Sequence, residues 1–256
     1  MENIPSITVI IYTYNNADQI QECINSAKLL THDIIILDQE SNDQTETIAK
    51  ENNIQLFSFP HVEYVEPARK AGIQQAQGQW VMILDADERI TQELAIEIQS
   101  EITKTTHTHY KLPRKNIFAH SKWLKHGGWW PDAQMRLINT SSFQDWPERI
   151  HSTPIITGSQ GILQNPFLHY FHGDITTMVE KTIKYEGIES DLLFNAGRSV
   201  SIPMFFRKFL MELYRRLIKN KGYKDGNIGI IESIYQAYSK TITWLYLYEK
   251  KNCSTV

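Results

Sequence analysis

The chain has 256 residues, enough for one large α/β domain or for a domain with a smaller appendage. Its formal net charge is −3, so the composition gives no global argument for nucleic-acid binding. The two cysteines, Cys23 on an expected helix and Cys253 in the tail, argue against a disulfide framework and fit a reducing compartment. The sequence lacks the basic start and apolar core of a signal peptide and has no stretch as long as a transmembrane helix, so we expect a cytoplasmic protein.

Strands and helices alternate over the first part of the chain. Apolar, β-branched or alternating runs predict four strands, at residues 7–12, 33–37, 54–59 and 80–84. Helical spacing of apolar residues predicts helices after Asn16 or Asp18 as cap, at about 67–77 and at about 91–104. This alternation predicts an α/β fold with a doubly wound, mainly parallel sheet.

The pattern changes after the third helix. Residues 110–118, 134–138 and 167–171 are typical of shorter strands, so the second half is expected to be mixed α+β. From Pro203 onward the chain is predicted to be helical, with a last helix at about 230–248.

Three carboxylates follow the fourth strand, at Asp85, Asp87 and Glu88. The carboxyl end of a strand in an open α/β sheet is where ligands bind, and clustered oxygens can hold Mg²⁺ or Mn²⁺ while leaving room for phosphate oxygens. The alternative is an acidic turn in which Asp or Glu caps the helix beginning near Thr91.

Paired glycines and tryptophans form a second unusual stretch, Gly127-Gly128-Trp129-Trp130. Flat aromatic rings stack on sugar faces, so Trp129 and Trp130 are candidates for an acceptor platform. The alternative is that both tryptophans close the core over a turn.

Residues 204–219 repeat apolar side chains every three or four positions, and the other face is almost wholly basic. Such a helix can lie on an anionic membrane surface, which would place the protein peripherally on the inner face of the cytoplasmic membrane. The alternative is a helix packed on the domain with a solvated Lys/Arg face.

Four segments together resemble glycosyltransferase family 2, the nucleotide-sugar-dependent inverting transferases with the GT-A fold. They are residues 9–16 (VIIYTYNN), 36–45 (ILDQESNDQT), 68–73 (ARKAGI) and 84–88 (LDADE). Residues 80–89, 128–137, 169–172 and 221–226 make the chain most similar to the bacterial lipopolysaccharide-core glucosyltransferase group. The resemblance implies a GT-A domain over 1–200, with a nucleotide-binding half of about 1–105 and an acceptor half of about 106–200, and a basic helical extension over 201–256.

The resemblance also implies roles for individual residues. Asp87 would bind the metal that bridges both phosphates, Asp85 would approach the ribose or metal-bound waters, and Arg69 would meet the diphosphate. A late histidine completes the metal shell in several such enzymes, and His172 is preferred to His169. The remaining nucleotide-sugar contacts are expected from Thr13, Tyr14, Asn16, Asp38, Ser41, Lys70 and Ala86.

Inversion requires a general base that removes the proton from the acceptor hydroxyl. The candidates are Asp132, Glu148 and His151, with Asp132 ranked first because it follows the expected acceptor platform. The lipopolysaccharide-core group often has His-Glu where this chain has His151-Ser152. Lys70 also departs from the family, in which asparagine is common at that position.

The resemblance thus implies an inverting transferase that moves a hexose, glucose in the first instance, from a UDP-sugar to a lipopolysaccharide-core or other cell-surface glycan with Mg²⁺ or Mn²⁺. The alternative from another class is a non-catalytic sugar-nucleotide-binding or membrane-surface protein of the same fold, which the Ser152 departure keeps open. A nucleotidyltransferase is less favoured because no Gly-rich activating loop lies near the N-terminus.

Overall fold

The computed structural model describes residues 5–104, 106–172 and 175–252. The chain divides into two compact units: unit 1 comprises residues 1–115 and 132–169, and unit 2 comprises residues 116–131 and 170–256. Each unit is therefore built from two separate stretches of sequence. The division expected at residues 105 and 200 remains a prediction.

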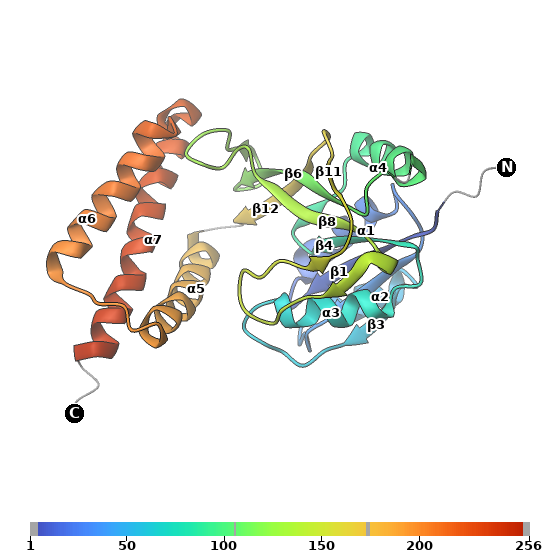
Figure 1. Ribbon diagram of the computed structural model, residues 1–256, viewed down its shortest axis with the longest axis horizontal. Helices are drawn as coiled ribbons and strands as arrows, with labels where there is room; N and C mark the ends of the chain where they lie inside the picture. The colour runs from blue at the N-terminus through green and yellow to red at the C-terminus, as the bar shows by residue number, and fades with distance from the viewer. Residues whose placement is uncertain (1–4, 105, 173–174, 253–256) are drawn as a thin grey trace. The chain divides into compact units, whose positions relative to one another are not determined.

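Unit 1 is organised around a sheet whose strands follow the order β3-β2-β1-β4-β8-β6-β12-β5, with β11 beside β6 (Figure 1). The four expected strands are present and pair in parallel, which confirms the predicted α/β sheet. They are β1 (Ile7–Thr13), β2 (Ile34–Asp38), β3 (Gln55–Ser58) and β4 (Trp80–Asp85). The later strands are β5 (Glu88–Arg89), β6 (His109–Phe118), β8 (Ala133–Asn139), β11 (Gln160–Ile162) and β12 (Phe167–His172). Because β8 pairs antiparallel with both β4 and β6, the sheet is mixed beyond β4.

Helices cover both faces of this sheet, since side chains alternate between the faces along each strand. Val9 and Ile11 of β1 belong to the core formed with the helices α1 and α4, whereas Ile10 and Tyr12 belong to the core on the opposite face, under α3. The helices of unit 1 are α1 (Ala17–Ala27), α2 (Thr45–Glu51), α3 (Glu66–Gln75) and α4 (Gln92–Lys104). A short 3₁₀ turn (Thr140–Ser142) leads into a separate hairpin of β9 (Phe143–Asp145) and β10 (Ile155–Ile156).

Helix α2 was not expected from the sequence. It is only 7 residues long, and just Thr45 and Ala49 are buried, so it shows little helical periodicity. The Asp43 carboxylate accepts hydrogen bonds from the backbone N–H groups of Thr45 and Ala17, and so serves the first residues of both α2 and α1. Asn16 precedes α1 but makes no side-chain cap, so the expected capping role falls to Asp43.

Unit 2 is mainly helical. Its helices are α5 (Ile175–Asn195), α6 (Ile202–Leu213), a π-helical turn (Tyr214–Lys219), a 3₁₀ turn (Gly222–Asp225) and α7 (Gly226–Asn252), and α7 packs against both α5 and α6. Strand β7 (Lys122–Trp123) pairs with the end of β6. Helix α5 was not expected, because after the helix at about 91–104 the next helices were predicted only from Pro203 onward. None of the helices in the described ranges is both long enough and apolar enough to cross a bilayer.

Two buried polar arrangements hold unit 2 together. The Glu186 carboxylate of α5 accepts hydrogen bonds from Ser239, Lys240 and Thr243 of α7. The Asp225 carboxylate accepts hydrogen bonds from the backbone N–H groups of Lys125 and His126 and lies 2.8 Å from His126 Nδ1. The loop 124–130 is therefore attached to the start of α7 although about one hundred residues separate them in sequence.

Candidate active site

The carboxyl ends of three neighbouring strands bring the first group of predicted residues together. In the parallel register, Thr13 of β1 lies beside Asp38 of β2, and Tyr12 of β1 lies beside Asp85 of β4. Ala86 follows directly, and its backbone N–H donates to the carbonyl of Tyr12. The predicted nucleotide-binding residues of the three strands thus meet at one edge of the sheet, where ligands bind in open α/β folds.

Short polar hydrogen bonds fix the loops at this edge. Ser41 donates to the buried Asp38 carboxylate through both its backbone N–H, at 2.9 Å, and its hydroxyl, at 2.5 Å. The Ser41 hydroxyl in turn accepts from the backbone N–H of Asn15. The Asn16 side-chain oxygen accepts from the backbone N–H of Tyr14. The hydrogen-bonded pair of Asp38 and Ser41 therefore fixes the loop that follows β1.

The ring of Tyr14 stacks on the ring of His61, with 3.7 Å between centroids and 22° between planes. His61 is exposed and follows the short strand β3, and it was not identified from the sequence. A flat pair of rings beside Asp38 is the kind of surface on which a nucleotide base can stack.

Tyr12 positions Arg69 through two contacts. The Tyr12 hydroxyl donates to the Arg69 carbonyl at 2.7 Å, and the Arg69 guanidinium lies over the Tyr12 ring. A Cβ atom at Gly72 would lie 2.3 Å from the Tyr12 hydroxyl oxygen, so glycine at this position makes the arrangement possible. Arg69 is 4 % exposed, and its Nη1 is buried without a hydrogen-bond partner among the described residues. That atom is a donor that a bound anion could satisfy.

Asp85 is shared by two guanidinium groups. Arg69 Nη2 lies 2.6 Å from one carboxylate oxygen of Asp85 and Arg136 Nη2 lies 2.7 Å from the other. Arg136 also lies 2.6 Å from the fully buried carboxylate of Glu88. Burial by itself would raise the pKa of Asp85, but Arg69 and Arg136 together outweigh it and hold that pKa below its usual range. Burial raises the pKa of Glu88, against the opposing effect of Arg136.

Asp132, the first-ranked base candidate, joins the same network. Arg114 Nε lies 2.7 Å from one Asp132 oxygen, and Gln134 donates to the other at 2.7 Å. Arg114 Nη1 lies 3.9 Å from Glu88, so Arg114 lies between the base candidate and the acidic cluster. Three guanidinium groups thus face three carboxylates, those of Asp85, Glu88 and Asp132.

The other base candidates have different surroundings. Glu148 and His151 are both exposed, and the backbone N–H of His151 donates to Glu66. Lys70 lies 2.8 Å from Asp145, which holds the pKa of the lysine above its usual value. Lys70 thus has a carboxylate partner within unit 1, which the sequence did not indicate.

Asp87, the predicted metal ligand, lies 3.6 Å from His169 Nε2. The pairing of β12 with β5 places His169 opposite Glu88, which brings its ring to the acidic cluster. The side chain of His172 lies outside the described residues. Within the described part of the chain, no group of three or more His, Cys, Asp or Glu side chains has an arrangement that could hold a metal ion by itself. Asp87 offers a carboxylate and His169 an imidazole nitrogen as metal ligands. This pair fits a divalent cation whose other ligands come from a bound phosphate.

The helix-capping alternative for the acidic cluster can be compared directly with the structure. The Thr91 hydroxyl accepts from the backbone N–H of Leu94 and so caps α4, which begins at Gln92. Asp85 and Glu88 contact arginines instead. The acidic turn is therefore part of an ion-pair network, and α4 has its own cap.

The tryptophans predicted to contact the acceptor lie in unit 2 and are half-buried. The Trp129 ring lies 4.7 Å from that of Phe171, and Trp130 meets Trp123 edge to face. The adjoining glycines both have positive φ, 67° at Gly127 and 87° at Gly128, a conformation that glycine adopts at little cost. These contacts fix the conformation of the loop. Acceptor binding by the two tryptophans remains a prediction.

Comparison with known proteins identifies the family. The glycosyl transferase family 2 model matches residues 8–163, which include the parallel strands β2, β3 and β4 and all but the first residue of β1. The chain belongs to glycosyl transferase family 2. It is also similar to an uncharacterized glycosyltransferase of Rickettsia prowazekii, 25 % identical over 245 residues, which covers 91 % of this chain and 84 % of the relative.

Solved structures of other proteins have a similar fold. Staphylococcus aureus TarS (residues 1–349) in complex with UDP-GlcNAc is 11 % identical and has a TM-score of 0.50, covering 97 % of this chain and 92 % of that chain. The mannosyltransferase PcManGT of Pyrobaculum calidifontis in complex with GDP-Man and Mn²⁺ is 12 % identical, also has a TM-score of 0.50, and covers 99 % and 77 %. The GT-A-like fold expected from the sequence is confirmed.

Two arginines of this network, Arg114 and Arg136, were not identified from the sequence. His172 was preferred to His169 there, and that preference stays a prediction because the His172 side chain lies outside the described residues. Arg136 had a usable signal, because a single charged residue inside the apolar strand Met135-Arg136-Leu137 predicts a buried partner. Arg114 lies in a less apolar strand and carried no comparable signal.

Proposed function

We propose that this family 2 glycosyltransferase moves a hexose, in the first instance glucose, from a UDP-sugar to a lipopolysaccharide-core or other cell-surface glycan acceptor with inversion. The observation that carries the proposal is the meeting of Thr13, Asp38 and Asp85 at one sheet edge, with the unpartnered Nη1 of Arg69 beside them. A nucleotide lying along that edge would place its base near Tyr14, its ribose near Asp38 and its diphosphate near Arg69.

The proposal of UDP rests on the residues at the expected base site. Tyr14 and His61 offer a stacking surface, and the Asp38–Ser41 pair offers polar atoms for a pyrimidine or ribose edge. The similar fold of TarS was obtained with UDP-GlcNAc, which supports a uridine donor, whereas the fold of PcManGT was obtained with GDP-Man. GDP is therefore the competitor that a binding test must include.

Charge balance supports a divalent cation. Arg69, Arg114 and Arg136 are already matched by Asp85, Glu88 and Asp132, so they supply no spare positive charge for a diphosphate. An incoming diphosphate therefore needs a further cation, and Asp87 with His169 would hold it. Imidazole nitrogen beside carboxylate favours Mn²⁺ over Mg²⁺, because Mg²⁺ prefers oxygen ligands. When bound, the cation would stabilise the charge that grows on the leaving diphosphate.

Asp132 remains the proposed general base. Its two oxygens are fixed by Arg114 and Gln134, so its orientation is set before an acceptor binds. The exposed positions of Glu148 and His151 provide no comparable positioning. The alternative, a sugar-nucleotide-binding protein without turnover, shares the donor site and differs in releasing no UDP.

The test is calorimetric titration of the full chain with UDP, GDP, CDP and ADP, each with and without Mn²⁺, beside an assay of UDP release from UDP-glucose. We expect Mn²⁺-dependent binding that prefers UDP, slow UDP release without acceptor and faster release with a lipopolysaccharide-core acceptor. Asp87→Ala and His169→Ala should weaken Mn²⁺-dependent UDP binding by at least about 10- to 100-fold, because even the outer-shell partners of metal ligands contribute that much to metal affinity.

Matched variants separate the steps. Asp191→Ala, which removes an exposed carboxylate paired with Lys250 far from these residues in sequence, should leave UDP binding unchanged. Asp132→Asn should keep UDP affinity and lose transfer by about 100-fold or more, the usual contribution of a general base. Binding without any UDP release by the unmodified protein would favour the non-catalytic alternative, and preference for GDP would overturn the donor.

A further inference from the structure

The helix α6 and the π-helical turn that follows it present an unusual exposed face. Exposed apolar side chains recur at every fourth position, at Ile202, Phe206, Leu210, Tyr214 and Ile218. A second exposed row follows each of them by one position and contains Arg207, Met211, Arg215 and Lys219. We call these two rows together the α6 face. Phe206 is 68 % exposed and Leu210 is 59 % exposed, which is unusual for large apolar side chains at regular spacing.

The π-helical turn limits the drift of the two rows around the helix axis. Because an α-helix completes a turn in 3.6 residues, a row with a spacing of four drifts steadily around the helix axis. A π-helix has more residues in each turn, so the same spacing drifts in the opposite direction. The π-helical turn Tyr214–Lys219 therefore reverses part of this drift and brings Ile218 back towards the side of the helix occupied by Leu210.

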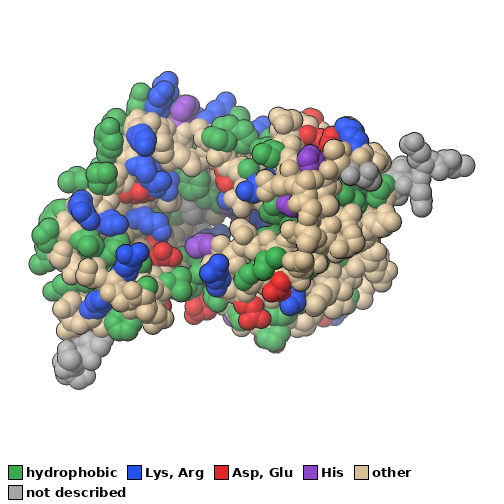
Figure 2. All heavy atoms as spheres, viewed as in Figure 1, with side chains coloured by type: hydrophobic (Ala, Val, Ile, Leu, Met, Phe, Trp, Pro, Cys, Tyr) green, Lys and Arg blue, Asp and Glu red, His purple; other side chains and the backbone are tan. Residues whose placement is uncertain are grey.

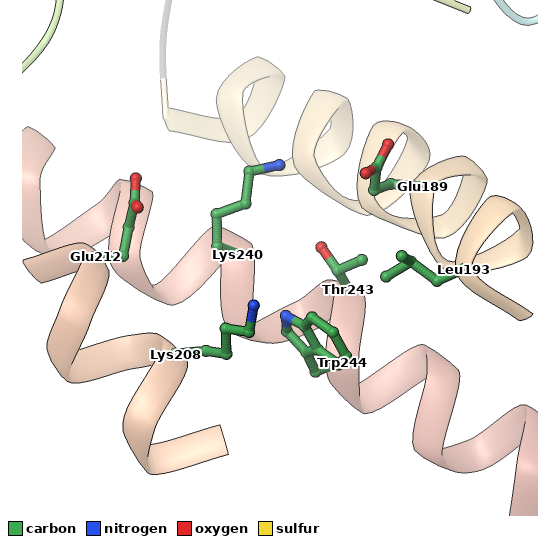
Figure 3. A pocket seen from close by; sticks show the side chains of 7 residues that line it. All are labelled: Glu189, Leu193, Lys208, Glu212, Lys240, Thr243 and Trp244. Atoms are coloured by element: carbon green, nitrogen blue, oxygen red, sulfur yellow. The ribbon is translucent and has the colours of Figure 1, made fainter. Parts of the chain in front are cut away.

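The charge of the α6 face has one sign. Residues 201–224 contain seven Lys and Arg residues and a single acidic residue, Glu212. Figure 3 shows Glu212 and Lys208 among the side chains that line a pocket of about 250 Å³ between α5, α6 and α7, with Lys208 Nζ 4.7 Å from the Trp244 ring. Glu212 forms ion pairs with Arg215 and Arg216, which lowers its pKa against the effect of burial and leaves it ionised and matched. The exposed basic groups Arg207 and Lys219 are not opposed by an exposed carboxylate on this segment.

We propose that the α6 face docks onto the surface of an anionic phospholipid bilayer. Apolar side chains interleaved with cations fit such a surface, because the rings and aliphatic chains enter the acyl boundary while guanidinium and ammonium groups contact headgroup phosphates. Figure 2 shows hydrophobic and basic side chains gathered over these helices with few acidic ones between them. A second protein chain would need a complementary acidic and apolar surface, whereas an anionic bilayer offers that combination everywhere. This proposal goes beyond glycosyl transfer and does not depend on the donor site.

The test is flotation of the full chain with vesicles of phosphatidylcholine alone or mixed with phosphatidylglycerol, without nucleotide or acceptor. We expect binding to the anionic vesicles, weak binding to the neutral ones, and loss of binding as salt is raised. Phe206→Ser with Leu210→Ser, and separately Arg207→Gln with Lys219→Gln, should each weaken the vesicle partition coefficient by at least about tenfold.

Each pair of substitutions has a matched control. Ile96 and Ile162 of unit 1 are 59 % and 60 % exposed, so Ile96→Ser with Ile162→Ser repeats the apolar loss elsewhere. Lys184→Gln with Lys251→Gln repeats the charge loss on exposed lysines of α5 and α7. Both controls should retain vesicle binding, and circular dichroism should show that every variant keeps its helices.

Other outcomes would overturn the proposal. Equal partition of the α6-face variants and their controls would show that this face does not contact lipid, as would equal binding to neutral and anionic vesicles. A dimer seen by light scattering without vesicles, and lost on Phe206→Ser with Leu210→Ser, would assign the face to a second copy of the chain. Because the readout requires no nucleotide, failure of UDP binding would leave these results interpretable.

Discussion

A single carboxylate, Asp85, connects most of the charged residues of the candidate site. Arg69 and Arg136 hold its two oxygens, and Arg136 extends the network to the buried Glu88. Buried ion pairs contribute little net stability compared with apolar packing, but removal of one partner leaves an uncompensated charge. The network therefore fixes the geometry of this sheet edge, and the free energy of unfolding is sensitive to each of its members.

This sensitivity predicts the effect of Asp85→Asn. The variant should lose about 3–5 kcal/mol of unfolding free energy at pH 7, because two buried guanidinium groups lose their shared carboxylate. The pKa of Asp85 lies below its ordinary value of 3.8 in the folded protein, so the stability due to its charge is present above about pH 4 and is lost as the pH falls through the folded pKa. The difference between the unmodified protein and the variant should therefore shrink below about pH 4.

Urea unfolding between about pH 7 and pH 3 measures that difference. Glu46→Gln is the control, because Glu46 forms an exposed ion pair with Lys50 and should change stability by less than about 1 kcal/mol. A difference for Asp85→Asn that stays constant as the pH falls would contradict the assigned pKa direction.

Strand β1 and helix α3 meet at one close contact that positions Arg69. Tyr12 is buried against α3 and donates to the Arg69 carbonyl, and Gly72 leaves the space for the Tyr12 ring. The segment Ala68-Arg69-Lys70-Ala71-Gly72 thus combines a charged residue aimed at the sheet edge with a glycine one turn later that lets the helix approach the strand.

We expect Gly72→Ala to lower the unfolding free energy by about 1–3 kcal/mol, because the added methyl group overlaps the Tyr12 ring in a packed core. Gly187 of α5 has no atom within 4 Å of an added Cβ, so Gly187→Ala should instead stabilise by up to about 1 kcal/mol through helix propensity. Urea denaturation of the two variants measures both effects. Two variants of equal stability would mean that α3 can shift away from β1.

The elements that the sequence predicted and those it did not differ in how much of their surface is buried. The strands β1, β2 and β4 are almost entirely buried, so their apolar runs predicted them well. Helix α5 carries exposed apolar residues, among them Ile183 and Leu192, which blur its helical period. A sequence pattern therefore predicts an element well where burial is nearly complete, and less well where exposed apolar side chains blur the difference between buried and solvent-facing positions.

The same reasoning applies to the candidate site. The acidic cluster and Arg69 could be predicted because they lie at strand and helix ends in short motifs. Arg136 depends on Glu88, 48 positions away, so its role follows from the antiparallel addition of β8 to the sheet. The sequence alone does not show that His169 faces the acidic cluster. That position follows from the pairing of β12 with β5, which places His169 opposite Glu88.

At the scale of the whole molecule, unit 2 is discontinuous in sequence. The loop 124–130 is joined to the C-terminal helices through Asp225, and Gly127 donates from its backbone N–H to Asn220 and accepts from Arg216. A chain ending near residue 201 would lose these partners along with α6. Truncation would therefore remove the α6 face and the contacts of this loop together, whereas point variants of the full chain change the α6 face alone.

Asp225→Ala should release this loop. Hydrogen–deuterium exchange of residues 124–130 should become faster, because the backbone N–H groups of Lys125 and His126 lose a charged acceptor. UDP affinity should stay the same, and transfer should fall if Trp129 and Trp130 contact the acceptor. Exchange in β2 and the variant Asp191→Ala serve as controls, and unchanged exchange at 124–130 would show that backbone packing alone holds the loop.

The discontinuity of unit 2 also bears on how the protein is made. Lys125 leaves the ribosome 100 residues before Asp225 does, which at about 5–20 residues per second is an interval of roughly 5–20 s. Throughout that interval the glycine–tryptophan loop lacks its hydrogen bonds to Asn220 and Asp225, and its aromatic rings are accessible to chaperones or to other nascent chains. Slower translation between residues 125 and 225 would lengthen this exposure, so the yield of native protein should depend on codon choice in that stretch more than on codon choice before it.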